Sequence, residues 1–143
     1  MKKTIIFILA FAAILIIACN NSENDEKENP YEGAWEVTYS KWIYPDTTIE
    51  TTKFVNPEVK ILTEKHFAFG LQSGKNKIDG GGGEYTYDAD TYTELIKYHF
   101  VSDFIGKSVV FKSKIEGEMW TLSTVYKSDS LDVDGTETWK RIE

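Results

Sequence analysis

From residue 35 onward, apolar and polar side chains alternate along the chain, the period of a β-strand with one buried face. In the first such segment, Trp35, Val37 and Tyr39 share a face. The alternation continues, interrupted by turn residues, to the end of the sequence. We expect strands at residues 35–40, 47–55, 59–63, 66–72, 84–88, 91–100, 108–115, 119–127 and 135–142.

Short strands separated by hairpin-like turns, such as Asp88–Asp90 and Glu116–Gly117, are typical of antiparallel all-β folds. The pattern of about eight or nine strands predicts an antiparallel β-sandwich or an antiparallel up-and-down β-barrel. We favour the barrel, because closing the sheet removes its exposed edges. A barrel of about eight strands is either filled by side chains or holds one small ligand. Residues 73–83, which include Gly80–Gly83, are expected to form a long mobile loop at the barrel mouth.

The first eighteen residues have a different pattern, in which Lys2 and Lys3 precede an apolar run from Ile5 to Ala18. A charged start followed by a run of this length is typical of a secretory signal peptide. A membrane-spanning helix needs about 20 apolar residues, so an uncleaved anchor is the less favoured alternative. We therefore assign residues 1–18 to a signal peptide.

The only cysteine of the chain, Cys19, follows this run directly. The stretch Ile16–Cys19 resembles a bacterial lipobox, which implies that Cys19 becomes the lipidated N-terminus of the mature protein. Residues 19–30 are acidic and have little to pack, so we expect a disordered tether. Together these features predict an outer-membrane lipoprotein that faces the periplasm or the cell surface.

Residues 31–143 remain as one domain. Loss of Lys2 and Lys3 with the signal peptide changes the formal net charge from −7 to −9. Such an acidic domain is a poor partner for nucleic acid or for an anionic membrane surface. The bilayer, reached through acylated Cys19, is the expected partner, and we expect a monomer.

Several stretches of the domain resemble one known group of proteins. Gly33-Ala34-Trp35 matches the Gly-x-Trp that opens the first strand of lipocalins, and "HFAFG", "GGGEYTYDADTYTELIKY", "KIEGEMWTL" and "ETWKRI" are similar to small lipocalin-like (calycin-type) β-barrel lipoproteins of Gram-negative bacteria. That family has no assigned biochemical function. The resemblance implies that Arg141, the only arginine, stacks on Trp35 and closes one end of the barrel. The alternative is that Arg141 binds an anion inside the cavity.

No motif for catalysis, metal or cofactor binding stands out. Gly80–Gly83 lack the Gly-Lys-Ser/Thr ending of a phosphate-binding loop, and Asp132 and Asp134 lack the glutamate that completes a calcium loop. The two histidines, His66 and His99, are too far apart for a zinc motif. We therefore expect a protein that is not an enzyme and that uses no cofactor or metal.

Glu94 shares a strand face with Tyr92, Ile96 and Tyr98, and we expect this aromatic face to point inward. A buried carboxylate would then need a partner or a raised pKa. In the opposite register, Thr93, Leu95, Lys97 and His99 would lie inside.

Two functions remain open. The first is a tethered binding protein for a small hydrophobic or amphipathic ligand, in a pocket lined by Tyr85, Tyr87, Tyr92, Glu94, Tyr98 and Trp120. The second is a non-enzymatic structural or interaction module of the cell envelope, in which the barrel is filled. In that case Trp42, Tyr44 and the loop 73–83 would be exposed contact points.

Overall fold

The computed structural model describes residues 28–127 and 132–143. Cys19, the signal peptide and most of the linker 19–30 lie outside this part of the chain.

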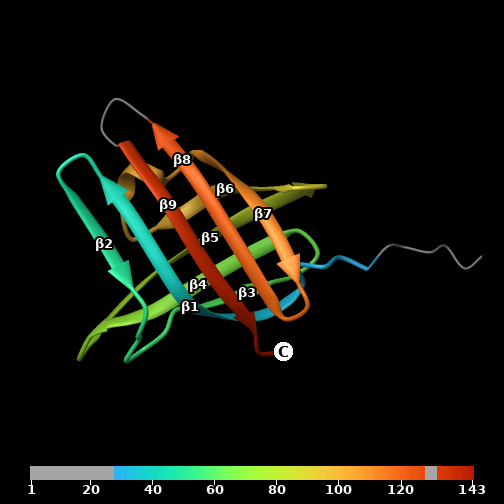
Figure 1. Cartoon of the computed structure of the whole chain (residues 1–143), viewed down its shortest axis with the longest axis horizontal. Helices are drawn as coiled ribbons and strands as arrows, with labels where there is room; N and C mark the ends of the chain where they lie inside the picture. Colours follow the sequence, from blue (N-terminus) through green and yellow to red (C-terminus); the bar gives the residue numbers. More distant parts are fainter. Residues whose placement is uncertain (1–27, 128–131) are drawn as a thin grey trace, which may run out of the picture.

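Antiparallel strands form one sheet that closes on itself (Figure 1). The sheet order β2-β1-β3-β4-β5-β6-β7-β8-β9, with the additional pairing of β1 and β9, gives a closed barrel of eight strands. The remaining strand, β2, is not part of the closed barrel and pairs only with the end of β1. The all-β, lipocalin-like barrel expected from the sequence is confirmed. The elements are β1 (Gly33–Tyr44), β2 (Thr47–Thr51), β3 (Val59–Leu62), β4 (His66–Gly74), β5 (Lys77–Asp88), β6 (Thr91–His99), the 3-10 helix η1 (Ser102–Phe104), β7 (Ser108–Glu116), β8 (Met119–Lys127) and β9 (Asp132–Arg141).

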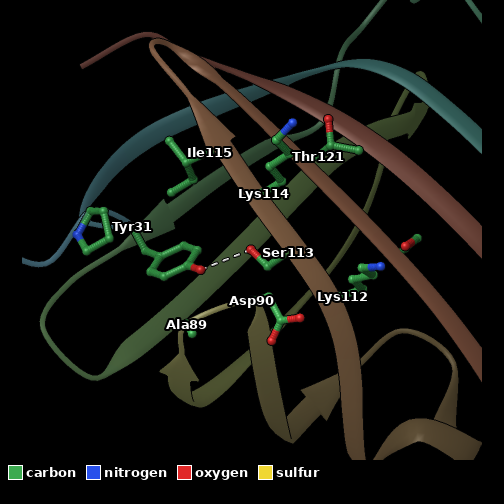
Figure 2. A pocket seen from close by; sticks show the side chains of 10 residues that line it. Tyr31, Ala89, Asp90, Lys112, Ser113, Lys114, Ile115 and Thr121 are labelled. Carbon is green, nitrogen blue, oxygen red and sulfur yellow. Dashed lines mark hydrogen bonds between the residues drawn. The ribbon is translucent and has the colours of Figure 1, made fainter.

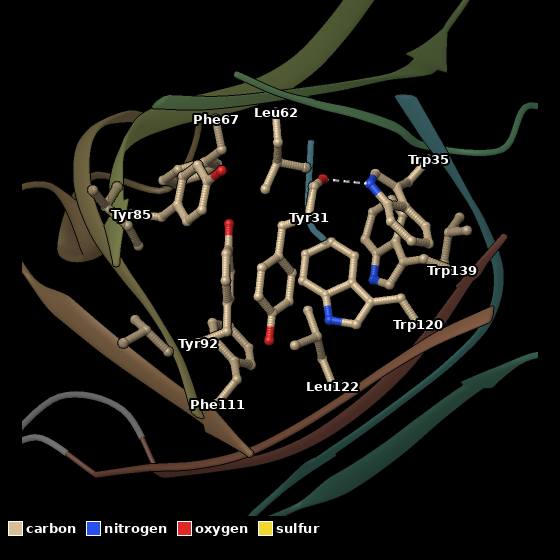
Figure 3. Close-up of a cluster of buried hydrophobic side chains, with 13 residues drawn as sticks. Tyr31, Trp35, Leu62, Phe67, Tyr85, Tyr92, Phe111, Trp120, Leu122 and Trp139 are labelled. Carbon is tan, nitrogen blue, oxygen red and sulfur yellow. Dashed lines mark hydrogen bonds between the residues drawn. The ribbon is translucent and has the colours of Figure 1, made fainter. Parts of the chain in front are cut away.

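One end of the barrel is filled by aromatic side chains (Figure 3). Trp35, Trp120, Trp139 and Tyr92 are fully buried there. The Trp120 ring centroid lies 5.2 Å from that of Trp35 and 5.0 Å from that of Tyr92, the latter in an edge-to-face arrangement. Burial of each large side chain contributes on the order of 2 kcal/mol, so this half of the barrel carries much of the folding energy.

The chain enters the barrel through this filled end. Tyr31 is buried among the aromatic rings, and its hydroxyl lies 3.0 Å from Ser113 Oγ. Asn29 Nδ2 donates a hydrogen bond of 2.7 Å to the Tyr85 hydroxyl, and Trp35 Nε1 donates one of 2.8 Å to the Tyr31 carbonyl. Asn29, near the end of the expected tether, therefore belongs to the folded domain, because its side chain is bonded to the barrel. The local sequence around Asn29 gives no sign of this contact.

The expectation of a long loop at residues 73–83 is wrong. Gly80–Gly83 lie inside β5, paired with β4 and β6, and none of them has a positive φ. A Cβ on Gly81 would lie 2.7 Å from a ring carbon of Phe69, and one on Gly82 would lie 2.6 Å from the Phe67 carbonyl oxygen. Glycine is required here because neighbouring groups fill the space of a side chain.

Candidate functional site

The opposite end of the barrel contains a cavity of about 390 Å³. Its wall combines aromatic rings with charged groups, and the residues come from nearly every strand around the barrel. This volume lies at the lower end of the range usual for small-molecule sites, about 300–1,000 Å³. The lining residues are Trp42, Tyr44, Glu58, Lys60, Phe69, Glu94, Ile96, His99, Phe100, Val101, Phe104, Val109, Phe111, Thr124, Tyr126, Val133 and Glu137.

A buried ion pair lies in the wall of this cavity. Lys60 Nζ on β3 is 2.9 Å from Glu94 Oε1 on β6, and the two residues are only 4% and 5% exposed. Burial alone would lower the pKa of Lys60, but the carboxylates of Glu94, Glu137 and Glu58 outweigh it and raise this pKa. Lys60 therefore stays protonated.

Aromatic faces surround the same ammonium group. Lys60 Nζ lies 4.8 Å from the ring centroid of Trp139, and 5.7 Å from those of Phe67 and Trp120. These distances fall within the range of cation–π attraction. The aromatic wall and the carboxylates thus stabilise a positive charge together.

Two further carboxyl groups, those of Glu58 and Glu137, line the cavity beside this pair. Burial raises the pKa of Glu58 to about 8, with repulsion from Glu137 adding to the effect and the Lys60 ammonium opposing it. Burial also raises the pKa of Glu137, although Trp139 Nε1 donates a hydrogen bond of 3.1 Å to its Oε2. One lysine therefore faces three carboxyl groups across the cavity.

One buried polar atom near Glu94 lacks a hydrogen-bond partner within the part of the chain that the structure describes. The Tyr92 hydroxyl is buried without a hydrogen-bond partner among the described residues. Burial, together with the nearby Glu94 carboxylate, raises the pKa of Tyr92 well above its ordinary value. Tyr92 is therefore a neutral phenol in the folded protein.

The end of β6 and helix η1 form one side of the cavity mouth. The rings of His99 and Phe100 stack with centroids 4.6 Å apart, and His99 lies 4.9 Å from Phe104. Val101 N–H donates a hydrogen bond of 3.0 Å to His99 Nδ1, and burial lowers the pKa of His99. This imidazole is therefore neutral at pH 7 and adds an aromatic surface rather than a charge.

The sequence-predicted lining residues lie in three places. Glu94 lines the cavity, whereas Tyr85, Tyr92 and Trp120 are buried in the filled half of the barrel. Tyr87 and Tyr98 do not line it either, and their exposed fractions are 43% and 60%. The inward prediction was wrong for Tyr98 because the register of β5 and β6 shifts between Gly82 and Gly83. This irregularity turns His99 toward the cavity in its place.

The filled end holds the stacked pair that the resemblance implied. Arg141 Cζ lies 4.1 Å from the ring centroid of Trp35, and the two residues are directly paired between β9 and β1. The guanidinium also donates hydrogen bonds to the carbonyl oxygens of Glu32 and, at 2.6 Å, Pro30. Arg141 is absent from the cavity lining, so the alternative of an anion clamp inside the cavity is wrong.

A second hollow, of about 760 Å³, lies beside the filled end (Figure 2). It lies beside the last residues of β7, which have no pairing partner in β6 because that pairing begins at Thr91 and Lys112. There the Tyr31 hydroxyl contacts Ser113 Oγ. Exposed side chains such as Lys112 and Lys114 border it. Because no buried charged group converges on this hollow, the cavity at the mouth is the better candidate site.

Several cavity residues were missed by sequence reasoning. Trp42 and Tyr44, expected as exposed contact points, line the cavity instead. On β3, Lys60 points inward together with Leu62, while Ile61 is 55% exposed; hydrophobicity alone favours Ile61 over Lys60 at an inward position. Glu58 and Glu137 give no local signal, because only the closed barrel brings them beside Lys60.

The described residues contain no cluster of His, Cys, Asp and Glu suited to hold a metal ion. Among the same residues, no helix has the length and apolar character needed to cross a membrane.

Comparison with known proteins agrees with the barrel. Residues 30–143 match the family model for a domain of unknown function, DUF4488. The chain belongs to the DUF4488 family. No curated protein matches it.

Two solved structures share the fold of this DUF4488 domain. A lipocalin-like protein from Bacteroides uniformis superposes with a TM-score of 0.51 at 11% identity, over 78% of this chain and 97% of that one. An uncharacterized protein from Bacteroides eggerthii gives a TM-score of 0.50, also at 11% identity, over 78% and 98% of the two chains. At this identity the likeness shows the lipocalin-like fold and nothing finer.

Proposed function

We propose that this DUF4488 protein binds a small hydrophobic or amphipathic molecule in the cavity at the barrel mouth. The observation that carries the proposal is the uneven filling of the barrel. One half is packed with tryptophan and tyrosine rings, and the other holds about 390 Å³ of space with convergent polar groups. A few placed polar groups in an apolar pocket are characteristic of ligand sites.

The contrasting expectation, a structural module with a filled barrel, has less support because only half of the barrel is filled. Trp42 and Tyr44, its proposed contact points, lie in the cavity wall rather than on a free surface. The proposed role is binding rather than catalysis, carried out by a monomer.

We further propose that acylated Cys19 tethers the domain to the outer membrane. Residues 29–31 enter the barrel at its filled end, opposite the end where η1 and the β1–β2 hairpin lie (Figure 1). The cavity is lined by Phe104 of η1 and Tyr44 of β1, so its mouth lies at the end opposite the entering chain. A tether at that end leaves the mouth open to the aqueous phase. Metabolic labelling with a radioactive fatty acid, compared between the wild type and Cys19→Ala, tests the acylation; absence of label in the wild type would refute it.

Ligand binding can be tested by tryptophan fluorescence. Trp42 lines the cavity, whereas the other three tryptophans are fully buried in the filled half. We expect the neutral probe N-phenyl-1-naphthylamine to become fluorescent on binding and to quench Trp42. Replacing Val109 by Trp should fill the cavity and abolish binding, while Val110→Trp on the outer face, where Val110 is 56% exposed, should not. Equal binding by both variants would place the probe elsewhere and refute the proposal.

A further inference from the structure

The cavity has an excess of acidic groups over basic ones. Its lining contains Glu58, Glu94 and Glu137 but only one lysine, Lys60. The Lys60 ammonium is already paired with Glu94 at 2.9 Å. A ligand entering this space therefore meets two further carboxyl groups, those of Glu58 and Glu137, which among the described lining residues share Lys60 as their nearby cation.

The aromatic lining favours the same kind of ligand charge. Trp42, Phe69, Phe100, Phe104 and Tyr126 present ring surfaces to the cavity. The negative faces of aromatic rings attract cations, and this attraction strengthens where water is excluded. Lys60 shows the effect within the protein, because its ammonium lies 4.8 Å from the centroid of the Trp139 ring.

We propose that the cavity binds an amphipathic organic cation, a primary or secondary ammonium with an apolar body. The ammonium group would lie between the carboxyl groups of Glu58 and Glu137, and the apolar body would pack against the rings of the mouth. This inference rests on the proposed binding function and specifies the chemical class of the ligand. An ammonium at this place also favours the charged form of Glu58, which burial otherwise disfavours.

A fatty-acid-like anion is the opposing choice for a lipocalin-like barrel. Its carboxylate would enter a wall that holds three carboxyl groups and one ammonium, and it could reach this ammonium only by displacing Glu94 from Lys60. Breaking a buried pair in this way is strongly unfavourable. The charges in the cavity wall therefore select against an anion.

The test uses three probes with the same eight-carbon chain: octylamine, octanol and octanoate. Each probe is titrated at pH 7 into a solution of residues 19–143, the linker and the barrel domain, with N-phenyl-1-naphthylamine bound. The loss of its fluorescence on displacement gives the affinity of the probe. We expect octylamine to bind at least tenfold more tightly than octanol, and octanoate to bind more weakly than octanol. Equal or tighter binding of octanol or octanoate would overturn the inference and leave the proposed function standing.

Variants locate the ammonium group. Glu58→Gln and Glu137→Gln, made singly and together, should remove most of the advantage of octylamine over octanol, measured as the ratio of the two affinities in each variant. Glu116→Gln, which removes a charge at the exposed end of β7, is the matched control. An undiminished advantage in both single variants would refute the inference. If neither the fluorescent probe nor any octyl compound binds the wild type, the proposed function itself fails.

Discussion

Lys60 and Glu94 form a buried ion pair across the barrel interior, from strands β3 and β6 that are not neighbours in the sheet. Their side chains are only 5% and 6% exposed, so each charge depends on the other for compensation. A buried pair adds little net stability compared with apolar residues of the same shape, but removing one partner leaves a charge stranded. The pair therefore fixes the arrangement of the charged groups in the cavity more than it strengthens the fold.

Replacing Lys60 alone should be costly. We expect Lys60→Met to lower the free energy of unfolding by about 3–5 kcal/mol, because Glu94 loses its cation in an aromatic environment. The double variant Lys60→Met/Glu94→Gln should recover at least half of this loss. Urea unfolding measures both values, and a double variant no more stable than the single one would contradict the compensating role of the pair.

Glu58 makes stability depend on pH. Its pKa is raised by burial to about 8 from an ordinary value of 4.5, so the folded state binds this proton more tightly than the unfolded state. The stabilising contribution of the proton is complete below the unfolded pKa and is lost as the pH rises through about 8. Glu58→Gln does not titrate, so its stability relative to the wild type should increase between pH 5 and pH 9.

The expected increase is at least about 1.4 kcal/mol, the equivalent of one pKa unit. Urea unfolding of the wild type and Glu58→Gln at both pH values measures it. Glu116→Gln serves as the control, since Glu116 is exposed and forms an ion pair with the equally exposed Lys114. A constant difference between Glu58→Gln and the wild type would show that the Glu58 carboxyl group is not perturbed.

Alternation along the chain was sufficient to predict the barrel and part of its interior. Tyr92, Glu94 and Ile96 point inward as their shared face predicted, because β6 is regular over this span. The alternation of inward and outward side chains is interrupted before Tyr98, where the register of β6 with β5 shifts. A shift of this kind arises from pairing with another strand, so the local pattern of β6 contains no sign of it.

The charged cavity was harder to predict for a related reason. Hydrophobicity assigns Lys60 to the outside of a short strand, and only contact with Glu94, distant in sequence, makes its burial favourable. The glycines of β5 led to a different error, because a loop was predicted where the structure has a strand. Four successive glycines indicate a loop by composition, but here they make room for Phe69, Tyr98 and neighbouring carbonyl groups.

Gly82 offers a direct test of this explanation. A methyl group there would lie 2.6 Å from the Phe67 carbonyl oxygen and 2.8 Å from a ring carbon of Tyr98. Since the backbone of a paired strand cannot easily move, we expect Gly82→Ala to destabilise the protein by about 1–3 kcal/mol. Gly74→Ala is the control, because its Cβ would make an ordinary contact of 3.6 Å with Lys77. Similar thermal unfolding temperatures for the two variants would contradict a steric role of Gly82.

Arg141 links the first strand, the last strand and the entering chain at the filled end. Its guanidinium stacks on Trp35 and donates hydrogen bonds to the carbonyl oxygens of Pro30 and Glu32. A lysine keeps the charge but offers neither a planar group for stacking nor two separated donors. We therefore expect Arg141→Lys to lower the free energy of unfolding by about 1–2 kcal/mol, the size of a cation–π contact and a hydrogen bond together.

The same substitution should loosen the entering segment before it affects the barrel. Hydrogen exchange should accelerate at the amide of Tyr31 in Arg141→Lys, while amides in the middle of β8 keep their protection. Lys140→Gln, at an exposed neighbouring position, should leave both unchanged. Because residues 29–31 close one end of the barrel and the cavity lies at the other, ligand binding should persist in Arg141→Lys. Loss of binding together with faster exchange would instead show that the two ends are coupled through the aromatic core.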